Sequence, residues 1–312
     1  MRNYARSVAA FVAVLSLTAS FGLSGTSALA SSGGIGSRTG VKDGGVGPSD
    51  PSPAASWTLA QSLTYANKLP GLSRVSSAFG TRLSHPYTPL GLAQATGTTT
   101  ALCPTNPTRT PTTAQCAPPA SKSISIYNDP EPNSYYGYQC GPAAGHNALG
   151  AYGVNYPVGT GYYPNASYLT QEMRTDSNGT VHTWMPGSLN SHESQNTYVW
   201  QTLGTPAGST NGTTDLLNYT VDDIWYNDSP IYNIETYGFD PITGTYRYPF
   251  SQYSVDIAHY LAAYGYSSSG AYISISDSAV QGSYTGSQRY TQYYQDVWAA
   301  IHNNPNLDAI LW

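Results

Sequence analysis

Hydrophobic patterning is confined to the later part of this chain, and this limits where a folded core can form. Residues 31–56 consist mainly of Gly, Ser and Pro, and residues 90–122 are rich in Thr and Pro and poor in apolar side chains. Such compositions are typical of linkers rather than of packed structure. Apart from a short helix predicted at 57–69, we interpret residues 31–122 as a linker or propeptide-like extension. We predict a folded domain over residues 123–312.

The first thirty residues have the pattern of an export signal. Arg2 and Arg6 precede an apolar stretch, and the Ala-Leu-Ala at 28–30 offers the small residues that signal peptidase reads. Ser, Thr and Gly interrupt the apolar stretch, which makes it a poor membrane span. We therefore expect residues 1–30 to be a cleaved signal peptide and the mature protein to be secreted, without a membrane span.

The charge of the chain argues against nucleic acid as a partner. The formal net charge is −5, and it becomes −7 when the signal and its two arginines are removed. A nucleic-acid-binding protein presents a basic patch, and none is evident here. Charged residues make up only 9% of the chain, whereas 28 residues are Tyr. Few carboxylates mean little change of charge on acidification, which suits an acidic exterior, but a compositional habit of the organism explains this equally well.

The three cysteines do not form an even set. Cys103 and Cys116 lie in the Pro- and Thr-rich segment, where a disulfide would close an otherwise weakly ordered loop, so we predict that they pair. This leaves Cys140 over. An odd cysteine in an exported chain is an accident, an intermolecular bridge or a thiol kept for chemistry.

From residue 123 onward the sequence predicts a series of helices and strands. Residues 123–128 alternate as a strand does, and residues 141–153 form an amphipathic helix with Pro142 in its first turn and Gly153 at its C-terminal end. Further predicted elements are short helical segments at 194–204, a helix at 220–228 with Thr220 as its N-cap, a strand at 230–239, strands at 254–266 and 270–279 joined by a Ser-rich turn, and a final helix at 290–304. A helix followed by mainly antiparallel strands predicts an α+β fold.

Cys140 lies where a helix start would stabilise a thiolate, through the helix dipole and the unbonded N–H groups. A thiolate nucleophile also needs a base. Five of the six histidines are better interpreted as solvated or structural, with His182 and His192 in polar loops and the others at positions of no evident chemistry: His85, His146 and His302. His259 differs, because it lies in a predicted strand on the same face as apolar neighbours.

The predicted hairpin brings an acid to this histidine. A turn centred on Ser268 places Asp277 directly opposite His259, with Cβ atoms about 5 Å apart. The carboxylate would fix the tautomer of the imidazole and stabilise its cation. A shift of one residue would separate them, because neighbouring residues of a strand face opposite sides. Each residue alone also has an ordinary interpretation, as a small buried hydrophobe, a core histidine and a turn cap.

Two segments resemble a known family. "YQCGPAAGHNALGAYG" at 138–153 resembles the nucleophile segment of C39-like cysteine peptidases, and "AHYLAAYGYSSSGAYISISDSA" at 258–279 resembles their later His and Asp segment. The closing helix and strand at 296–312 also look like the end of such domains, in the type that bacteria secrete. The resemblance covers about residues 123–312. It implies a papain-like fold, in which an N-terminal helix carrying the Cys packs on an antiparallel sheet carrying the His and Asp.

The resemblance also implies the roles of individual residues. Cys140 would be the nucleophile, His259 its base and Asp277 the residue that orients the base. The family usually places a Gln or similar amide donor shortly before the Cys, for the oxyanion hole. Six residues before it this chain has Ser134, so Asn133 and Gln139 are the candidates.

We therefore expect a secreted thiol peptidase that acts on peptide or protein substrates as a monomer. No His and Cys cluster has zinc spacing and no phosphate-binding Gly loop is present, so we expect no metal and no cofactor. Two alternatives stay open: an acyltransferase or transglutaminase-like enzyme on the same triad, and a non-catalytic cell-surface binding module.

Overall fold

The computed structural model of the protein describes the following residues: 68, 118–132, 138–203, 211–279, 288–304 and 309–312. Several predicted features lie outside these ranges, namely the signal peptide, the Cys103–Cys116 disulfide, His85 and Asn133. The helix predicted at 57–69 also lies outside them, except for Lys68, which is helical.

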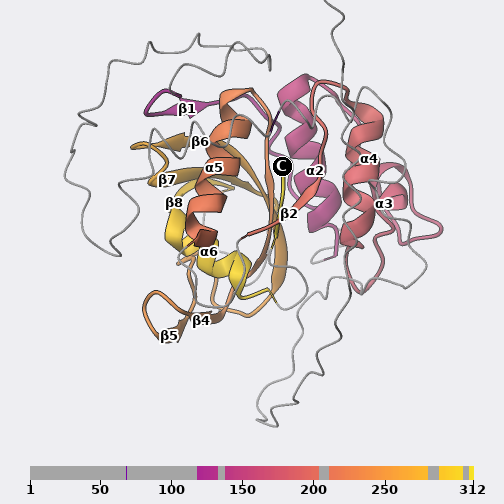
Figure 1. The fold of residues 1–312 in the computed structure, drawn as a ribbon. Helices are drawn as coiled ribbons and strands as arrows, with labels where there is room; N and C mark the ends of the chain where they lie inside the picture. The colour runs from indigo at the N-terminus through magenta and orange to yellow at the C-terminus, as the bar shows by residue number, and fades with distance from the viewer. Residues whose placement is uncertain (1–67, 69–117, 133–137, 204–210, 280–287, 305–308) are drawn as a thin grey trace, which may run out of the picture. The chain divides into compact units, whose positions relative to one another are not determined.

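Within the described residues, an antiparallel sheet of seven strands forms the centre of the domain (Figure 1). Its strands run in the order β2-β9-β3-β6-β7-β8, and β1 pairs with β6 as well. Their bounds are β1 (Lys122–Ser123), β2 (Trp200–Thr202), β3 (Ile231–Glu235), β6 (Ala258–Ser267), β7 (Tyr272–Asp277), β8 (Arg289–Tyr293) and β9 (Ala309–Leu311). A second, two-stranded sheet pairs β4 (Gly238–Asp240) with β5 (Thr245–Arg247).

Two groups of helices cover the two faces of this sheet (Figure 1). One group contains α2 (Cys140–Leu149), α3 (Tyr168–Glu172) and α4 (Met185–His192), together with the short helical turns η5 (Gly150–Tyr152) and η6 (His182–Trp184). The other contains α5 (Asn211–Trp225) and α6 (Tyr294–His302). In the first group, α2 packs directly on β6, which lies in the middle of the sheet.

Neighbouring residues of one strand enter two different cores. Ile231 of β3 and Leu311 of β9 pack with α2, whereas Tyr232 and Ile310 pack with α5 and α6. Successive side chains of a strand point to opposite faces, so each strand contributes to both cores. The prediction of a mixed fold with helices and an antiparallel sheet is confirmed.

The helix predicted at 141–153 is present, but α2 covers Cys140–Leu149, the turn η5 follows it, and α2 is buried on all sides rather than amphipathic. Pro142 lies in the first turn, and Gly153 ends the following helical turn in the left-handed conformation, with φ of 71°. Every residue of α2 is buried. A Cβ added at Gly145 would lie 2.8 Å from Cε of Met173, so the small residues of this helix allow the neighbouring helices to come close.

In the middle of the chain, one predicted helix is wrong in its start and another in its type. Thr220 does not cap a helix, because α5 begins at Asn211 and Thr220 lies inside it, with its hydroxyl 2.7 Å from that of Tyr232. The segment predicted as helical at 194–204 contains strand β2, which pairs with β9. In both cases tertiary contacts decide against the local signal.

Two further boundaries differ from prediction at the ends of the domain. The first four residues of the predicted helix at 290–304 belong to strand β8, since its Tyr and Thr residues suit pairing with β7. The strand predicted at 123–128 is reduced to the two residues of β1. Beyond it the chain leaves the sheet and contacts α2, where the N–H of Tyr127 donates to the carbonyl of Asn147 over 3.3 Å.

In the described part of the chain, none of the helices combines the length and the apolar character needed to span a bilayer.

Candidate active site

Cys140 begins helix α2 and is almost completely buried, with 1% of its surface exposed. It carries a free thiol. The thiol forms a hydrogen bond with the imidazole of His259 and receives another from the backbone of Tyr260. Packing of α2 against β6 therefore brings the helix start to the beginning of a strand, and the predicted Cys and His meet.

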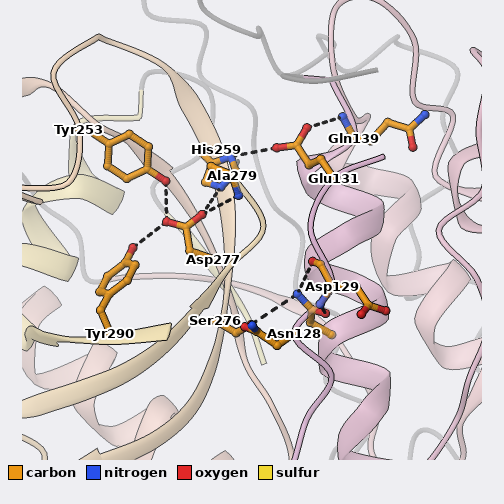
Figure 2. A network of polar contacts seen from close by, with 11 residues as sticks. Asn128, Asp129, Glu131, Gln139, Tyr253, His259, Ser276, Asp277, Ala279 and Tyr290 are labelled. Atoms are coloured by element: carbon orange, nitrogen blue, oxygen red, sulfur yellow. Dashed lines mark hydrogen bonds and ion pairs between the residues drawn. The ribbon is translucent and has the colours of Figure 1, made fainter. Parts of the chain in front are cut away.

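His259 and Asp277 also meet, but not in the predicted register. The Nε2 atom of His259 lies 2.9 Å from Oδ1 of Asp277 (Figure 2). Directly opposite Asp277, however, is Leu261, two residues along β6 from His259. The contact is thus a diagonal one across the strand pair, which a side chain as long as histidine can span.

The difference begins in the turn, which is longer than predicted. Ser268 and Ser269 both have positive φ, and the N–H of Ser269 donates to the carbonyl of Ala120 over 2.7 Å. The turn occupies residues 268–271, and Ser267 pairs with Tyr272. This offset of three residues from the predicted pairing is odd, so taken alone it would turn Asp277 to the face opposite His259.

A β-bulge at Tyr264 restores the common face. The register shifts between Ala263, which pairs with Ile275, and Gly265, which pairs with Ser274, and this leaves Tyr264 as the extra residue. Because the bulge absorbs one residue, Asp277 returns to the face of Leu261 and His259. The meeting of acid and base therefore depends on an irregularity that the alternating pattern does not reveal.

The carboxylate of Asp277 accepts four hydrogen bonds (Figure 2). Oδ1 accepts from His259 and, over 2.9 Å, from the N–H of Ala279. Oδ2 accepts from the hydroxyls of Tyr253, at 2.6 Å, and Tyr290, at 2.9 Å. These partners hold the carboxylate in one orientation and compensate for its burial. Sequence analysis did not identify either tyrosine, because in a chain with 28 tyrosines neither has a distinguishing spacing.

The bond to Asp277 fixes the orientation of the imidazole. Since Nε2 of His259 donates to Asp277, Nδ1 is the ring nitrogen that is left to interact with Cys140. Burial disfavours the imidazolium, but the charge of Asp277 and its hydrogen bond outweigh burial and hold the pKa of His259 well above its usual value. The imidazole is therefore basic enough to keep the proton that the thiol must lose.

The Cys140 thiol ionises less readily than an ordinary thiol. Burial raises the pKa of Cys140, and the hydrogen bond and charge of His259 act in the opposite direction without cancelling burial. Because the two groups share a hydrogen bond, their protonation is coupled, and a buried thiolate is stable only beside a charged imidazole. The arrangement can supply a nucleophile and a proton donor at adjacent atoms.

A second carboxyl group, that of Glu131, lies on the other side of the imidazole (Figure 2). Its side chain is 3% exposed, with Oε1 3.9 Å from Nδ1 of His259. Its Oε2 accepts from the N–H of Gln139, the residue before Cys140, over 3.3 Å. No sequence signal points to Glu131, because it lies in an irregular segment, nine positions before the cysteine.

The structure places Gln139 beside the nucleophile but engages its side chain elsewhere. Its Nε2 donates to the carbonyl of Gly161 over 3.2 Å, and its Oε1 accepts from the hydroxyl of Thr170, also at 3.2 Å. These bonds tie the amide to the chain around α3 rather than to Cys140. Asn133, the other predicted oxyanion donor, is among the residues that the structure does not describe.

A comparison with protein-family models matches residues 108–306 to the Peptidase_C39 like family. The chain belongs to this family. A search of the curated proteins found no match, and neither did a search of the solved structures. Membership in the Peptidase_C39 like family indicates a cysteine peptidase, that is, a hydrolase of peptide bonds in peptides or proteins. The matched range contains all the residues of the site: Cys140, His259, Asp277, Glu131, Tyr253 and Tyr290.

The other described histidines of this C39-like chain have structural partners. His146 is buried between Asp129, 3.0 Å from its Nδ1, and Asn155, 3.2 Å from its Nε2. The prediction that His182 and His192 lie in loops is wrong. His182 begins the turn η6, and His192 ends α4, where its Nε2 lies 2.7 Å from Glu172.

Metal binding has no evident place in the described residues. Among them, no group of three or more His, Cys, Asp or Glu side chains is arranged to hold a metal ion.

Proposed function

We propose that this chain is a secreted cysteine peptidase in which Cys140 is the nucleophile, His259 the acid and base, and Asp277 the residue that orients His259. The observations that carry the proposal are the 2.9 Å contact between Nε2 of His259 and Oδ1 of Asp277, and the mutual effect of the Cys140 thiol and the His259 imidazole on each other's pKa. The helix that begins at Cys140 packs on the strand that carries His259, as in a papain-like fold.

The first half of the reaction forms a thioester. The Cys140 thiolate attacks the carbonyl carbon of the peptide, a C–S bond forms, and the carbonyl electrons move to oxygen. When this intermediate collapses, the C–N bond breaks and Nδ1–H of His259 protonates the leaving amine. Asp277 holds the ring so that Nδ1 stays toward the sulfur throughout.

The second half returns the enzyme to its starting state. Water attacks the thioester carbon and gives a proton to Nδ1 of His259, the C–S bond breaks, and the acid product leaves with the thiolate restored. We assign the oxyanion of both intermediates to the backbone N–H of Cys140, since the first N–H groups of a helix have no partner within it. Asn133 stays a predicted second donor.

The regions ahead of the domain complete the proposal. Residues 1–30 act as a signal peptide that is removed on export, and residues 31–122 form an extension closed in part by a Cys103–Cys116 disulfide. The charged start, the apolar stretch and the small residues before position 31 support export. N-terminal sequencing of the protein from culture medium is expected to begin at Ser31, whereas a retained Met1 in the cell fraction would contradict export.

The test of the reaction uses the full chain, expressed with its own leader and collected from the medium. A library of peptides derived from a digested proteome serves as substrate between pH 4 and 8, and mass spectrometry detects new termini. We expect cleavage by the wild type and none by Cys140→Ser or His259→Ala. Hydrolysis places an oxygen from H₂¹⁸O in the new carboxyl group, whereas transfer to an amine does not.

The same samples are treated with iodoacetamide as a measure of site assembly. Rapid alkylation of Cys140 that depends on His259, without any cleavage of the library, would show a reactive thiol that is not a general peptidase. Alkylation at the rate of an ordinary thiol, with no cleavage, would overturn the proposed chemistry and leave a binding module.

A further inference from the structure

Glu131 is held at the site by both elements that carry the reacting groups. Its backbone N–H donates to the carbonyl of Ser278, next to Asp277, over 3.0 Å. Two residues earlier, the N–H of Asp129 donates to Oδ1 of Asn147 in α2 over 2.8 Å. The segment before the nucleophile is thus fixed to the end of β7 and to α2, and the Glu131 carboxyl has a defined position relative to each.

That position sets two carboxyl groups around one imidazole. Asp277 contacts Nε2 of His259, and Glu131 lies 3.9 Å from Nδ1, the other ring nitrogen (Figure 2). Glu131 also reaches the N–H of Gln139, so it lies between the base and the helix start. Among the described residues, the titratable groups around it are Cys140 of α2, His259 of β6 and, behind the ring, Asp277 of β7.

An ionised carboxylate at this place has opposite effects on the two reacting groups. It attracts the proton of His259, competing with the thiolate for the same side of the imidazolium, and it repels negative charge on sulfur. After burial, which is the main cause, the charge of Glu131 is one of the influences that raise the pKa of Cys140. A neutral carboxyl group in the same position would exert neither effect.

We propose that Glu131 is a positioning residue that restrains the nucleophile: its carboxylate, between Nδ1 of His259 and the N–H of Gln139, competes with the thiolate for the imidazolium and favours Cys140 as a thiol. This inference rests on the proposed function for its meaning but concerns the charge of the pair itself.

The test replaces Glu131 by Gln, which has nearly the same shape, can still accept the N–H of Gln139 and cannot ionise. The rate of Cys140 alkylation by iodoacetamide is measured against pH in the full chain. In Glu131→Gln we expect the midpoint of thiolate formation to fall by about one pH unit, which corresponds to roughly tenfold more thiolate at a given pH below the midpoint.

Asp129→Asn is the matched control. It removes a negative charge from the same segment, but Asp129 is 55% exposed at its side chain and contacts His146 rather than His259. Its alkylation profile is expected to follow the wild type. Equal shifts in both variants would attribute the effect to net charge and overturn the assignment to Glu131. Thermal unfolding of all three proteins checks that the variants are folded.

Activity gives a second readout. The ratio of kcat/KM of Glu131→Gln to that of the wild type should be up to about tenfold at a pH below the thiolate midpoint and close to one above it, if activity follows the fraction of thiolate. A ratio below one at every pH would show that the reaction needs the ionised carboxylate, contrary to the proposal. If the alkylation midpoint shifts and neither protein cleaves peptides, the restraint stands and the peptidase function fails.

Discussion

The buried ion pair of Lys68 and Asp223 and the site around His259 differ in the balance of the charges they bury. Nζ of Lys68 lies 3.2 Å from Oδ1 of Asp223, both side chains are fully buried, and the ammonium lies 4.5 Å from the centre of the Trp312 ring. This contact joins a cation to an anion. Around His259, by contrast, two carboxyl groups and a thiol face a single imidazole.

This difference separates a structural role from a chemical one. In an ion pair of this kind, each charge is most stable when its partner is charged too. Where acids outnumber the base, the last proton has several positions of similar free energy. Proton movement between such positions is what nucleophilic catalysis requires.

The largest effect is expected from a substitution of Asp277, the acid that contacts Nε2 of His259. Asp277→Asn cannot accept hydrogen bonds at both ends, yet donors lie at both: His259 and Ala279 on one side, Tyr253 and Tyr290 on the other. The imidazole loses its fixed tautomer, so kcat should fall roughly a thousandfold to ten-thousandfold.

Steady-state kinetics on a peptide cleaved by the wild type measures this loss, with Asp129→Asn as the control that keeps full activity. A decrease of less than tenfold in Asp277→Asn would mean that the carboxylate does not orient the base. Circular dichroism confirms that the variant is folded.

Substitutions in the Lys68–Asp223 ion pair should change the stability of the protein rather than its catalytic activity. Lys68→Met leaves Asp223 buried without its cation and is expected to lower the free energy of unfolding by about 3–5 kcal/mol. Urea unfolding measures the loss. The double variant Lys68→Met/Asp223→Asn should recover much of it, because the uncompensated charge is gone. Unchanged stability in the single variant would refute a stabilising role for this contact.

A further test uses Glu193, a buried acid that interacts with the charge of Lys68 and has a raised pKa. Burial raises its pKa to about 7, against the hydrogen bonds from the N–H groups of Asn196 and Gln195 and the charge of Lys68. Between its unfolded value of about 4.5 and about 7, unfolding releases a proton, so stability decreases as pH rises through this window. The decrease amounts to about 3 kcal/mol and then levels off.

Glu193→Gln should remove this slope and be more stable than the wild type at pH 7.5 but not at pH 4.5. Urea unfolding of both proteins at the two pH values checks the sign. The raised pKa of His259 adds a slope of the same sign, because stability from its protonated form is complete below about 6.5 and is lost as pH rises toward its folded value. Greater stability of the wild type at pH 7.5 than at pH 4.5 would contradict both.

The smallest effect concerns the outer partners of Asp277. Tyr290→Phe and Tyr253→Phe each remove one hydroxyl donor from Oδ2 and leave the other in place. Each should lower kcat by about tenfold, the worth of one hydrogen bond to a charged group. The double variant should lose more than the product of the two, since Oδ2 then has neither donor. No change in either single variant would show that Oδ1 alone holds the carboxylate.

Local signals were enough to name the residues that meet. The helix over 141–153 follows from its small residues, its early proline and its final glycine, and the acid and base follow from alternation in two strands. The predicted helices and strands were wrong where a local preference competed with a contact to a distant part of the chain. Thr220 has the chemistry of a helix cap but bonds to Tyr232, and the Tyr-rich start of the last predicted helix pairs with β7 instead.

The sequence by itself determined which side chains could do chemistry, because a cysteine at a helix start and a histidine in a buried strand are recognisable within a few residues. Only the tertiary structure decided how they meet. The bulge at Tyr264 corrects the face of Asp277, the two tyrosines complete its hydrogen bonds, and Glu131 reaches His259 from an irregular segment. None of these contacts has a periodic signature, because each joins segments whose separation is set by the packing of α2 on the sheet.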